Sequence, residues 1–123
     1  MTDSKFIDSS VWIEYLTNGS FKEIFESNDI LLLSVLSLFE IKKVLVKQKI
    51  NYDKILKSLY FIKDKSLFIN VDANIAESAA ELSDKYKLPS IDALIYASAL
   101  KNNAILITMD NDFRKLDNVT LIS

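Results

Sequence analysis

The sequence has 123 residues, with 15 basic and 17 acidic side chains, a formal net charge of −2, and neither cysteine nor histidine. Without these two residue types the chain can form no disulfide, thiolate nucleophile, zinc–thiolate site or histidine-containing catalytic triad. If the protein is an enzyme, its chemistry must come from carboxylates, hydroxyls, lysines or a bound cation. Oxygen ligands of this kind favour Mg²⁺ or Mn²⁺.

Length and composition predict a soluble protein with one domain. The chain is long enough for one core, and 50% of its residues are hydrophobic. No apolar run approaches the roughly 20 residues that cross a bilayer, and the N-terminus lacks the features of a signal peptide. A single glycine and a single proline exclude a glycine-rich phosphate-binding loop. We therefore expect one domain over residues 1–123, a cytoplasmic location and no membrane association.

In the first half of the chain, short apolar runs alternate with helical patterns. Ser9 or Ser10 can cap the first helix, Asn18-Gly19 ends it, and Asn51 marks a later turn. A continuous apolar run bounded by polar residues is typical of a buried strand. The expected elements are strands at residues 5–7 and 30–33 and helices at residues 9–17, 21–26, 37–48 and 53–62.

The second half continues the alternation. Pro89-Ser90 is expected to open a helix, with Ser90 as its cap. The expected elements are strands at residues 67–71, 104–108 and 119–122 and helices at residues 74–86, 91–101 and 111–116. Strands separated by helices pair in parallel through right-handed crossovers. The predicted fold class is therefore α/β, a three-layer α/β/α sandwich with a mostly parallel central sheet.

Acidic residues follow two of the predicted strands. Asp8 comes directly after the first strand, and Asp110 and Asp112 come after the strand at residues 104–108. Sites in open parallel sheets form beyond the carboxyl ends of the strands. The alternative for each residue is a helix cap, because aspartate is favoured at helix N-termini.

Two further acids lie inside predicted helices. Asp92 is in the first turn of an apolar helix, where a buried carboxylate is costly unless it is paired or bound to a cation. Glu40 lies one turn into its helix, at the margin of the apolar face. Because Lys43 and Lys47 are within helical reach of Glu40, periodicity alone favours a surface salt-bridge ladder there.

The charge is unevenly distributed. Residues 41–65 contain eight lysines and two aspartates, so that this basic sector carries +6 and the remainder of the chain −8. Such a sector could attract a polyanion. It could equally be a solvated pair of helices, and the sequence leaves both interpretations open.

Four short motifs follow one another along the chain. They are Asp8-Ser9-Ser10 after a strand, the segment from Ser34 to Glu40 at a helix start, the segment from Ile91 to Ile95 at another helix start, and Thr108-Met109-Asp110-Asn111-Asp112-Phe113 after a strand. Their order and spacing resemble those of PIN-domain ribonucleases, and most closely the VapC-type toxins of type II toxin–antitoxin systems. The resemblance covers essentially the whole chain.

This resemblance implies an acidic pocket that binds one or two Mg²⁺ or Mn²⁺ ions and hydrolyses RNA phosphodiester bonds. The residues that match the family pattern are the catalytic and metal-binding acids Asp8, Glu40, Asp92 and Asp110, with Asp112, Ser10 and Thr108 as accessory residues. For Glu40 the resemblance overrides the salt-bridge interpretation. Clustered carboxylates repel one another, and a divalent cation relieves that repulsion.

The resemblance also implies three partners: an RNA substrate, a cognate antitoxin protein and a second copy of the chain in a homodimer. In the basic sector, Lys42, Lys43 and Lys47 are the candidates for contacts to the RNA backbone. The antitoxin tail is expected in a groove formed by the early helices. Its candidate lining residues, each also a candidate for the core, are Trp12, Tyr15, Leu16, Phe21, Phe25 and Phe39.

Two other functions are compatible with parts of this pattern. A magnesium-dependent phosphatase or phosphotransferase would also place an aspartate at the end of the first strand, but a haloacid-dehalogenase-type phosphatase has a second aspartate two residues later, where this chain has Ser10. A PIN-like module that binds RNA or protein without cutting is the other alternative. Such modules tend to lose the acids, whereas all four positions are filled here.

Overall fold

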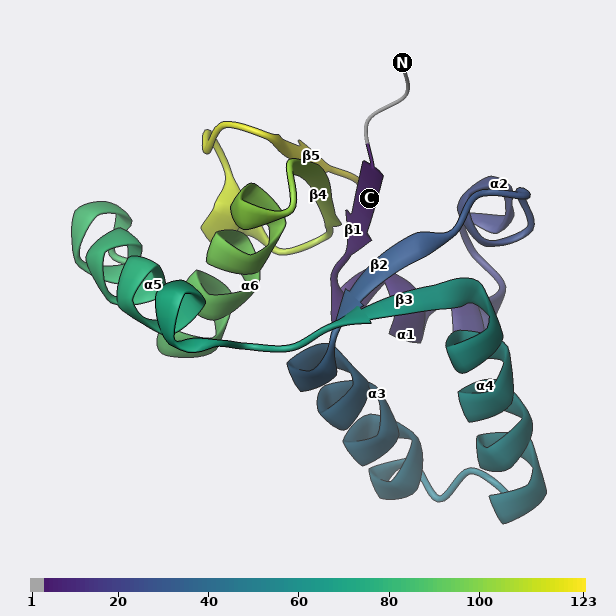
Figure 1. Cartoon of the computed structure of the whole chain (residues 1–123). Helices are drawn as coiled ribbons and strands as arrows, with labels where there is room; N and C mark the ends of the chain where they lie inside the picture. The colour runs from purple at the N-terminus through teal and green to yellow at the C-terminus, as the bar shows by residue number, and fades with distance from the viewer. Residues whose placement is uncertain (1–3) are drawn as a thin grey trace.

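The computed structural model describes residues 4–123, and five strands in this part of the chain form one parallel sheet (Figure 1). The strands are β1 (Ser4–Ile7), β2 (Leu31–Ser34), β3 (Ser66–Ile69), β4 (Ala104–Thr108) and β5 (Val119–Leu121). Their order is β3-β2-β1-β4-β5. The chain thus starts in the middle of the sheet, moves outward to β3, and then returns to the other side of β1. The point where the direction reverses lies between β1 and β4, and ligands bind at such points in open sheets.

The helices connect successive strands. They are α1 (Ser9–Asn18), α2 (Lys22–Phe25), α3 (Val35–Lys47), α4 (Tyr52–Lys65), α5 (Ala73–Tyr86) and α6 (Ser90–Lys101), with the 3₁₀ turn η1 (Asn111–Phe113) after β4. Gly19 ends α1 with a φ of 74°, the left-handed conformation that glycine adopts without strain. None of the helices in residues 4–123 is both long and apolar enough to cross a membrane.

The core lies on both faces of the sheet. Successive strand residues point to opposite faces, so that Phe6 packs with the residues of α5 and α6 while Ile7 packs with those of α1, α3 and α4. In β4, Leu106 likewise packs on the side of α5 and α6, and Ile107 packs on the side of α1, α3 and α4. Figure 1 shows α5 and α6 on one side of the sheet and α1, α3 and α4 on the other. The predicted three-layer α/β/α sandwich is confirmed, and all observed strand pairs are parallel.

Both predicted serine caps were wrong. The N-cap positions are held by Asp8 in α1 and Pro89 in α6, and Ser9 and Ser90 are already helical. Asp8 stays extended because its N–H donates to the Ile107 carbonyl at 3.0 Å, which continues the sheet by one residue. A proline immediately before a helix has no N–H to leave unpaired, and its fixed φ suits the position.

Other boundaries differ by a few residues. β2 begins at Leu31 because Ile30 is exposed and leaves the sheet, and β3 ends at Ile69, two residues earlier than expected. The helix expected at 111–116 is a single 3₁₀ turn that ends at Phe113. The prediction that α6 is largely buried is confirmed, except that Ile91 in its first turn is exposed.

Candidate active site

Asp8 lies at the carboxyl end of β1, in the centre of the sheet. Its side chain is only 7% exposed and makes no capping hydrogen bond to α1. Instead, Asp8 Oδ2 accepts hydrogen bonds from Ser10 Oγ at 2.9 Å and from Thr108 Oγ1 at 2.8 Å. Neither hydroxyl engages Oδ1. The alternative interpretation of this side chain as a helix cap is therefore wrong.

The two hydroxyl groups also join the ends of β1 and β4. Ser10 Oγ accepts from the Met109 N–H at 3.2 Å, and Thr108 Oγ1 accepts from the Asp110 N–H at 3.0 Å. Each hydroxyl thus donates to the Asp8 carboxylate and accepts from the chain that follows β4. This network fixes the position of the Asp8 carboxylate relative to the backbone of Asp110.

A second group of acids lies beside this network. One carboxylate oxygen from each of Asp92, Asp110 and Asp112 lies within 4.8 Å of the others. Asp92 comes from the first turn of α6, and the other two come from the turn after β4. Asp110 also caps η1, because its Oδ1 accepts from the Asp112 N–H at 2.9 Å. Asp112, expected only as an accessory residue, therefore belongs to this group of close carboxylates.

Glu40 reaches the site from α3. Its Oε1 accepts a hydrogen bond from Ser9 Oγ at 3.3 Å, across the contact between α1 and α3. Neither Lys43 nor Lys47 forms an ion pair with Glu40 in the described part of the chain. The surface salt-bridge ladder that periodicity favoured is therefore absent in residues 4–123. Ser9, expected as a cap, was not recognised as a partner of Glu40, because a hydrogen bond across 31 residues leaves no pattern in the sequence.

The negative charges of these acids repel one another. Burial raises the pKa of Asp92 to about 7, and the negative charges of Asp110, Asp8 and Asp112 act in the same direction. Burial also raises the pKa of Asp8, although the hydrogen bonds from Thr108 and Ser10 partly offset this effect. For Glu40, burial and then the Asp8 charge raise the pKa. Five carboxylates from four parts of the chain therefore form one electrostatically coupled site.

This donor set fits a divalent cation. Carboxylate oxygens are the ligands that Mg²⁺ and Mn²⁺ prefer, and a positive ion would offset the burial and the mutual repulsion that raise these pKa values. Asp92, Asp110 and Asp112 are the acids whose oxygens are already close enough to share one ion. Asp8 adds a carboxylate whose Oδ2 is held by two hydroxyls.

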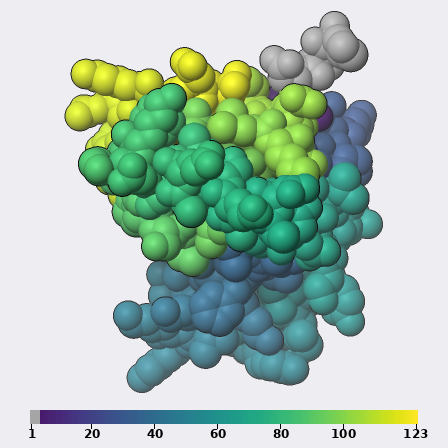
Figure 2. All heavy atoms as spheres, turned by 60° about the vertical axis from the view of Figure 1, so that its left-hand side comes forward, coloured from purple at the N-terminus to yellow at the C-terminus, as the bar shows by residue number. Residues whose placement is uncertain are grey.

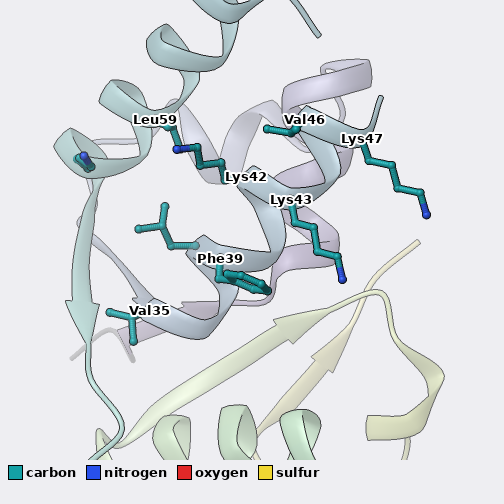
Figure 3. Close-up of a pocket in the computed structure, with 9 residues that line it drawn as sticks. Val35, Phe39, Lys42, Lys43, Val46, Lys47 and Leu59 are labelled. Atoms are coloured by element: carbon teal, nitrogen blue, oxygen red, sulfur yellow. The ribbon is translucent and has the colours of Figure 1, made fainter. Parts of the chain in front are cut away.

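The three candidate lysines for RNA contacts are all exposed on α3, but they do not face the same way. Lys43 and Lys47 line a cavity of about 420 Å³ together with Glu40. Lys42 does not line this cavity. It lines the larger groove between α3 and α4 together with Lys43 and Lys47, and Figure 3 shows its side chain extending toward Leu59 of α4. Lys43 and Lys47 are therefore the lysines near the acids.

The six apolar residues proposed for a partner groove do not line a common surface. Trp12 and Phe25 are fully buried and pack against each other with ring centroids 4.5 Å apart, which confirms the alternative that they belong to the core. Tyr15 and Leu16 line a shallow depression with Phe61 of α4. Phe39 lies elsewhere, on the exposed face of α3.

The PIN domain family matches the sequence over residues 5–119, which is nearly the whole chain. The chain belongs to the PIN domain family. The acids of this PIN domain lie at the carboxyl ends of the central strands and at the nearby helix starts, and each of the four motifs contributes at least one of them. No curated protein matches the sequence.

Solved structures share the fold of this PIN domain at low sequence identity. A toxin–antitoxin complex from Klebsiella pneumoniae has a TM-score of 0.83 and 22% identity, covering 95% of this chain and 96% of that chain. A DNA-bound VapBC from Salmonella typhimurium has a TM-score of 0.80 and 13% identity, covering 98% of each chain. The Mycobacterium tuberculosis toxin VapC20, described as cleaving the sarcin–ricin loop, has a TM-score of 0.68 and 20% identity, covering 89% of this chain and 92% of that chain.

Proposed function

We propose that this PIN domain is a metal-dependent endoribonuclease and the toxin of a toxin–antitoxin pair. The observation that carries the proposal is the coupled carboxylate site of Asp8, Glu40, Asp92, Asp110 and Asp112. The proposal is also supported by membership of the PIN domain family and by structural neighbours that are toxins or toxin–antitoxin complexes.

In this proposal Mg²⁺ or Mn²⁺ is held by four aspartates, which are Asp8, Asp92, Asp110 and Asp112. Glu40 adds a further negative charge beside them. A bound divalent ion supplies an acidified water and stabilises the charge that develops on a phosphodiester. The residues of the chain prepare the site for it. Ser10 and Thr108 fix the Asp8 carboxylate, and Ser9 orients Glu40. The acids need no histidine to reach their working protonation state, because ion binding favours their charged forms.

The basic sector has a role in the same proposal. Lys43 and Lys47 line the cavity that contains Glu40, where they can neutralise phosphates that enter the site. An acidic pocket alone would repel RNA, so these positive charges favour approach of the polyanion from the α3 side. We further propose that the whole chain acts as one domain in the cytoplasm.

Two partners belong to the proposal. The first is a cognate antitoxin, supported by the neighbouring structures, which are described as toxin–antitoxin and VapBC complexes. The depression lined by Tyr15, Leu16 and Phe61 is a surface that its tail could cover. The second is another copy of this chain in a homodimer.

The two alternative functions are less well supported. A haloacid-dehalogenase-type phosphatase would need a second aspartate two residues after Asp8, but this chain has Ser10 there, and the Ser10 hydroxyl donates to Asp8 Oδ2. A binding module without catalysis would not need five clustered carboxylates, because the raised pKa values of Asp8, Glu40 and Asp92 show that their charged forms are costly in the metal-free fold.

Cleavage of total RNA by the purified protein tests the proposal. We expect discrete fragments with Mg²⁺ or Mn²⁺, no fragments with EDTA, and no fragments with Asp92→Asn. The matched control is Asp84→Asn, which removes an exposed acid whose ion pair with Lys87 is on the surface of the molecule. The nuclease proposal fails if the wild type does not cut, or if cleavage persists in EDTA and in Asp92→Asn, which would indicate a contaminating ribonuclease.

A further inference from the structure

Phe39 is unusual among the seven phenylalanines of the chain. Its side chain is 67% exposed, whereas every other phenylalanine is buried or no more than about a third exposed. Single exposed apolar residues are common and need no explanation by themselves. Phe39, however, lies next to Glu40 in the sequence and lines the same cavity of about 420 Å³.

Phe39 also belongs to a row of side chains along α3. Phe39, Lys43 and Lys47 are spaced by four residues, so that they follow one another on a single helix face. Figure 3 shows these three side chains extending to the same side of α3, away from the side on which Lys42 approaches α4. An aromatic ring and two positive charges therefore lie in line.

The cavity beside this row borders the carboxylate site. Its wall includes Glu40, which is electrostatically coupled to Asp8, and Ile91, which immediately precedes Asp92. Figure 2 shows α3 (blue) below α5 and α6 (green), with the outline of the molecule narrowing where the two parts meet. A chain of phosphates bound at the acids would thus pass Lys43 and Lys47 as it leaves along α3.

We propose that Phe39 is a stacking platform for an unpaired nucleobase next to the cleaved phosphodiester, with Lys43 and Lys47 holding the adjoining phosphates. An aromatic ring stacks on any base, and nearby lysines track the backbone, which is the usual design for binding single strands. This inference rests on the proposed nuclease function, because it places the base relative to the same carboxylates.

A protein partner on Phe39 is the competing occupant. Phe39, Lys43 and Lys47 also line the larger groove between α3 and α4, where a protein segment could lie. The observations favour RNA because the ring lies beside two lysines and shares the smaller cavity with Glu40. A docking surface for a second copy of the chain would not need to border the carboxylates.

Equilibrium binding separates these occupants. The probe is a labelled pool of randomised single-stranded oligoribonucleotides, and the protein carries Asp92→Asn so that the RNA stays intact. We expect Phe39→Ala to weaken binding about 10-fold, Phe39→Leu to weaken it similarly because the ring is lost, and Phe39→Trp to retain it. Binding of the same pool annealed to its complement should change little. The control is Tyr60→Ala, which removes a 72% exposed aromatic residue from α4.

Two further measurements make each outcome decisive. Without the Asp92 substitution, Phe39→Ala should bind Mn²⁺ as the wild type does, and its mass by light scattering should be unchanged. The stacking role is overturned if Phe39→Ala or Phe39→Leu binds the single-stranded pool normally, or if Phe39→Ala changes only the oligomeric state. Failure of the nuclease function itself would appear earlier, as a wild type that neither cuts RNA nor binds Mn²⁺.

Discussion

Thr108 Oγ1 donates a 2.8 Å hydrogen bond to Asp8 Oδ2, and the two residues are 100 positions apart in the sequence. The bond is buried and joins the carboxyl ends of the neighbouring strands β1 and β4, where the strand order reverses. The same hydroxyl accepts from the Asp110 N–H, so that one side chain orients two of the acids. Thr108 therefore links the fold of the sheet directly to the geometry of the carboxylate site.

Replacement of this hydroxyl should affect both stability and activity. Thr108→Val keeps the shape but leaves the Asp8 carboxylate with the Ser10 hydroxyl as its one remaining side-chain donor and the Asp110 N–H without its Thr108 acceptor. We expect the free energy of unfolding to fall by about 1–3 kcal/mol and RNA cleavage to fall about 10- to 100-fold. Denaturant unfolding and cleavage assays measure the two effects. Thr120→Val, at an exposed position of β5, should change neither; equal effects of the two substitutions would contradict the assignment.

The metal-free protein should lose stability as pH rises. The pKa of Asp92 is about 7 in the folded protein and 3.8 in its ordinary state. Between these values the folded state binds more protons than the unfolded state, so that the free energy of unfolding falls with increasing pH. The raised pKa values of Asp8 and Glu40 act in the same direction. Denaturant titrations in EDTA across this range measure the slope.

Asp92→Asn is the variant that tests this assignment. Its uncharged amide should flatten the slope and make the metal-free protein more stable than the wild type above about pH 7. Asp84→Asn, on the exposed surface of α5, should leave the slope unchanged. A wild-type stability that rises with pH through this window would show that the carboxylate repulsion is not expressed in solution.

Metal should reverse this destabilisation. Because an ion that binds only the folded state stabilises it by mass action, Mn²⁺ at 100 times its dissociation constant should add about 2.7 kcal/mol to the free energy of unfolding. Thermal unfolding with increasing Mn²⁺ measures the effect. We expect a smaller shift in Asp112→Asn, since Asp112 belongs to the group of three close carboxylates. If Mn²⁺ stabilises Asp112→Asn as much as the wild type, Asp112 is not a metal ligand and has only an accessory role.

The salt dependence of RNA binding should distinguish the lysines of α3. Lys43→Ala and Lys47→Ala should each reduce the slope of log affinity against log salt by about one, because each removes a phosphate contact. Lys42→Ala removes the same charge but lies on the groove toward α4, so its effect should be smaller. Equal slopes for all three variants would indicate a diffuse field rather than a defined path.

Local patterns were sufficient for much of the fold. Apolar runs and helical spacing predicted the strands and helices in the right order, and their alternation predicted parallel pairing. The errors lie at element ends such as Ser9 and Ser90, where the difference between a cap and a first helical residue depends on contacts elsewhere. Asp8 remained extended because of a hydrogen bond to Ile107, which no local pattern near Asp8 encodes.

Residue types and their order along the chain define which chemistry is available: carboxylates without histidine or cysteine, at strand ends and helix starts. How these groups meet depends on the tertiary structure. It brought Asp112 into the group of close carboxylates with Asp92 and Asp110, paired Ser9 with Glu40, buried Trp12, and left Phe39 exposed beside Glu40. The physical reason is that residue type and spacing specify local conformation, whereas burial and hydrogen-bond partners depend on contacts between segments far apart in the chain.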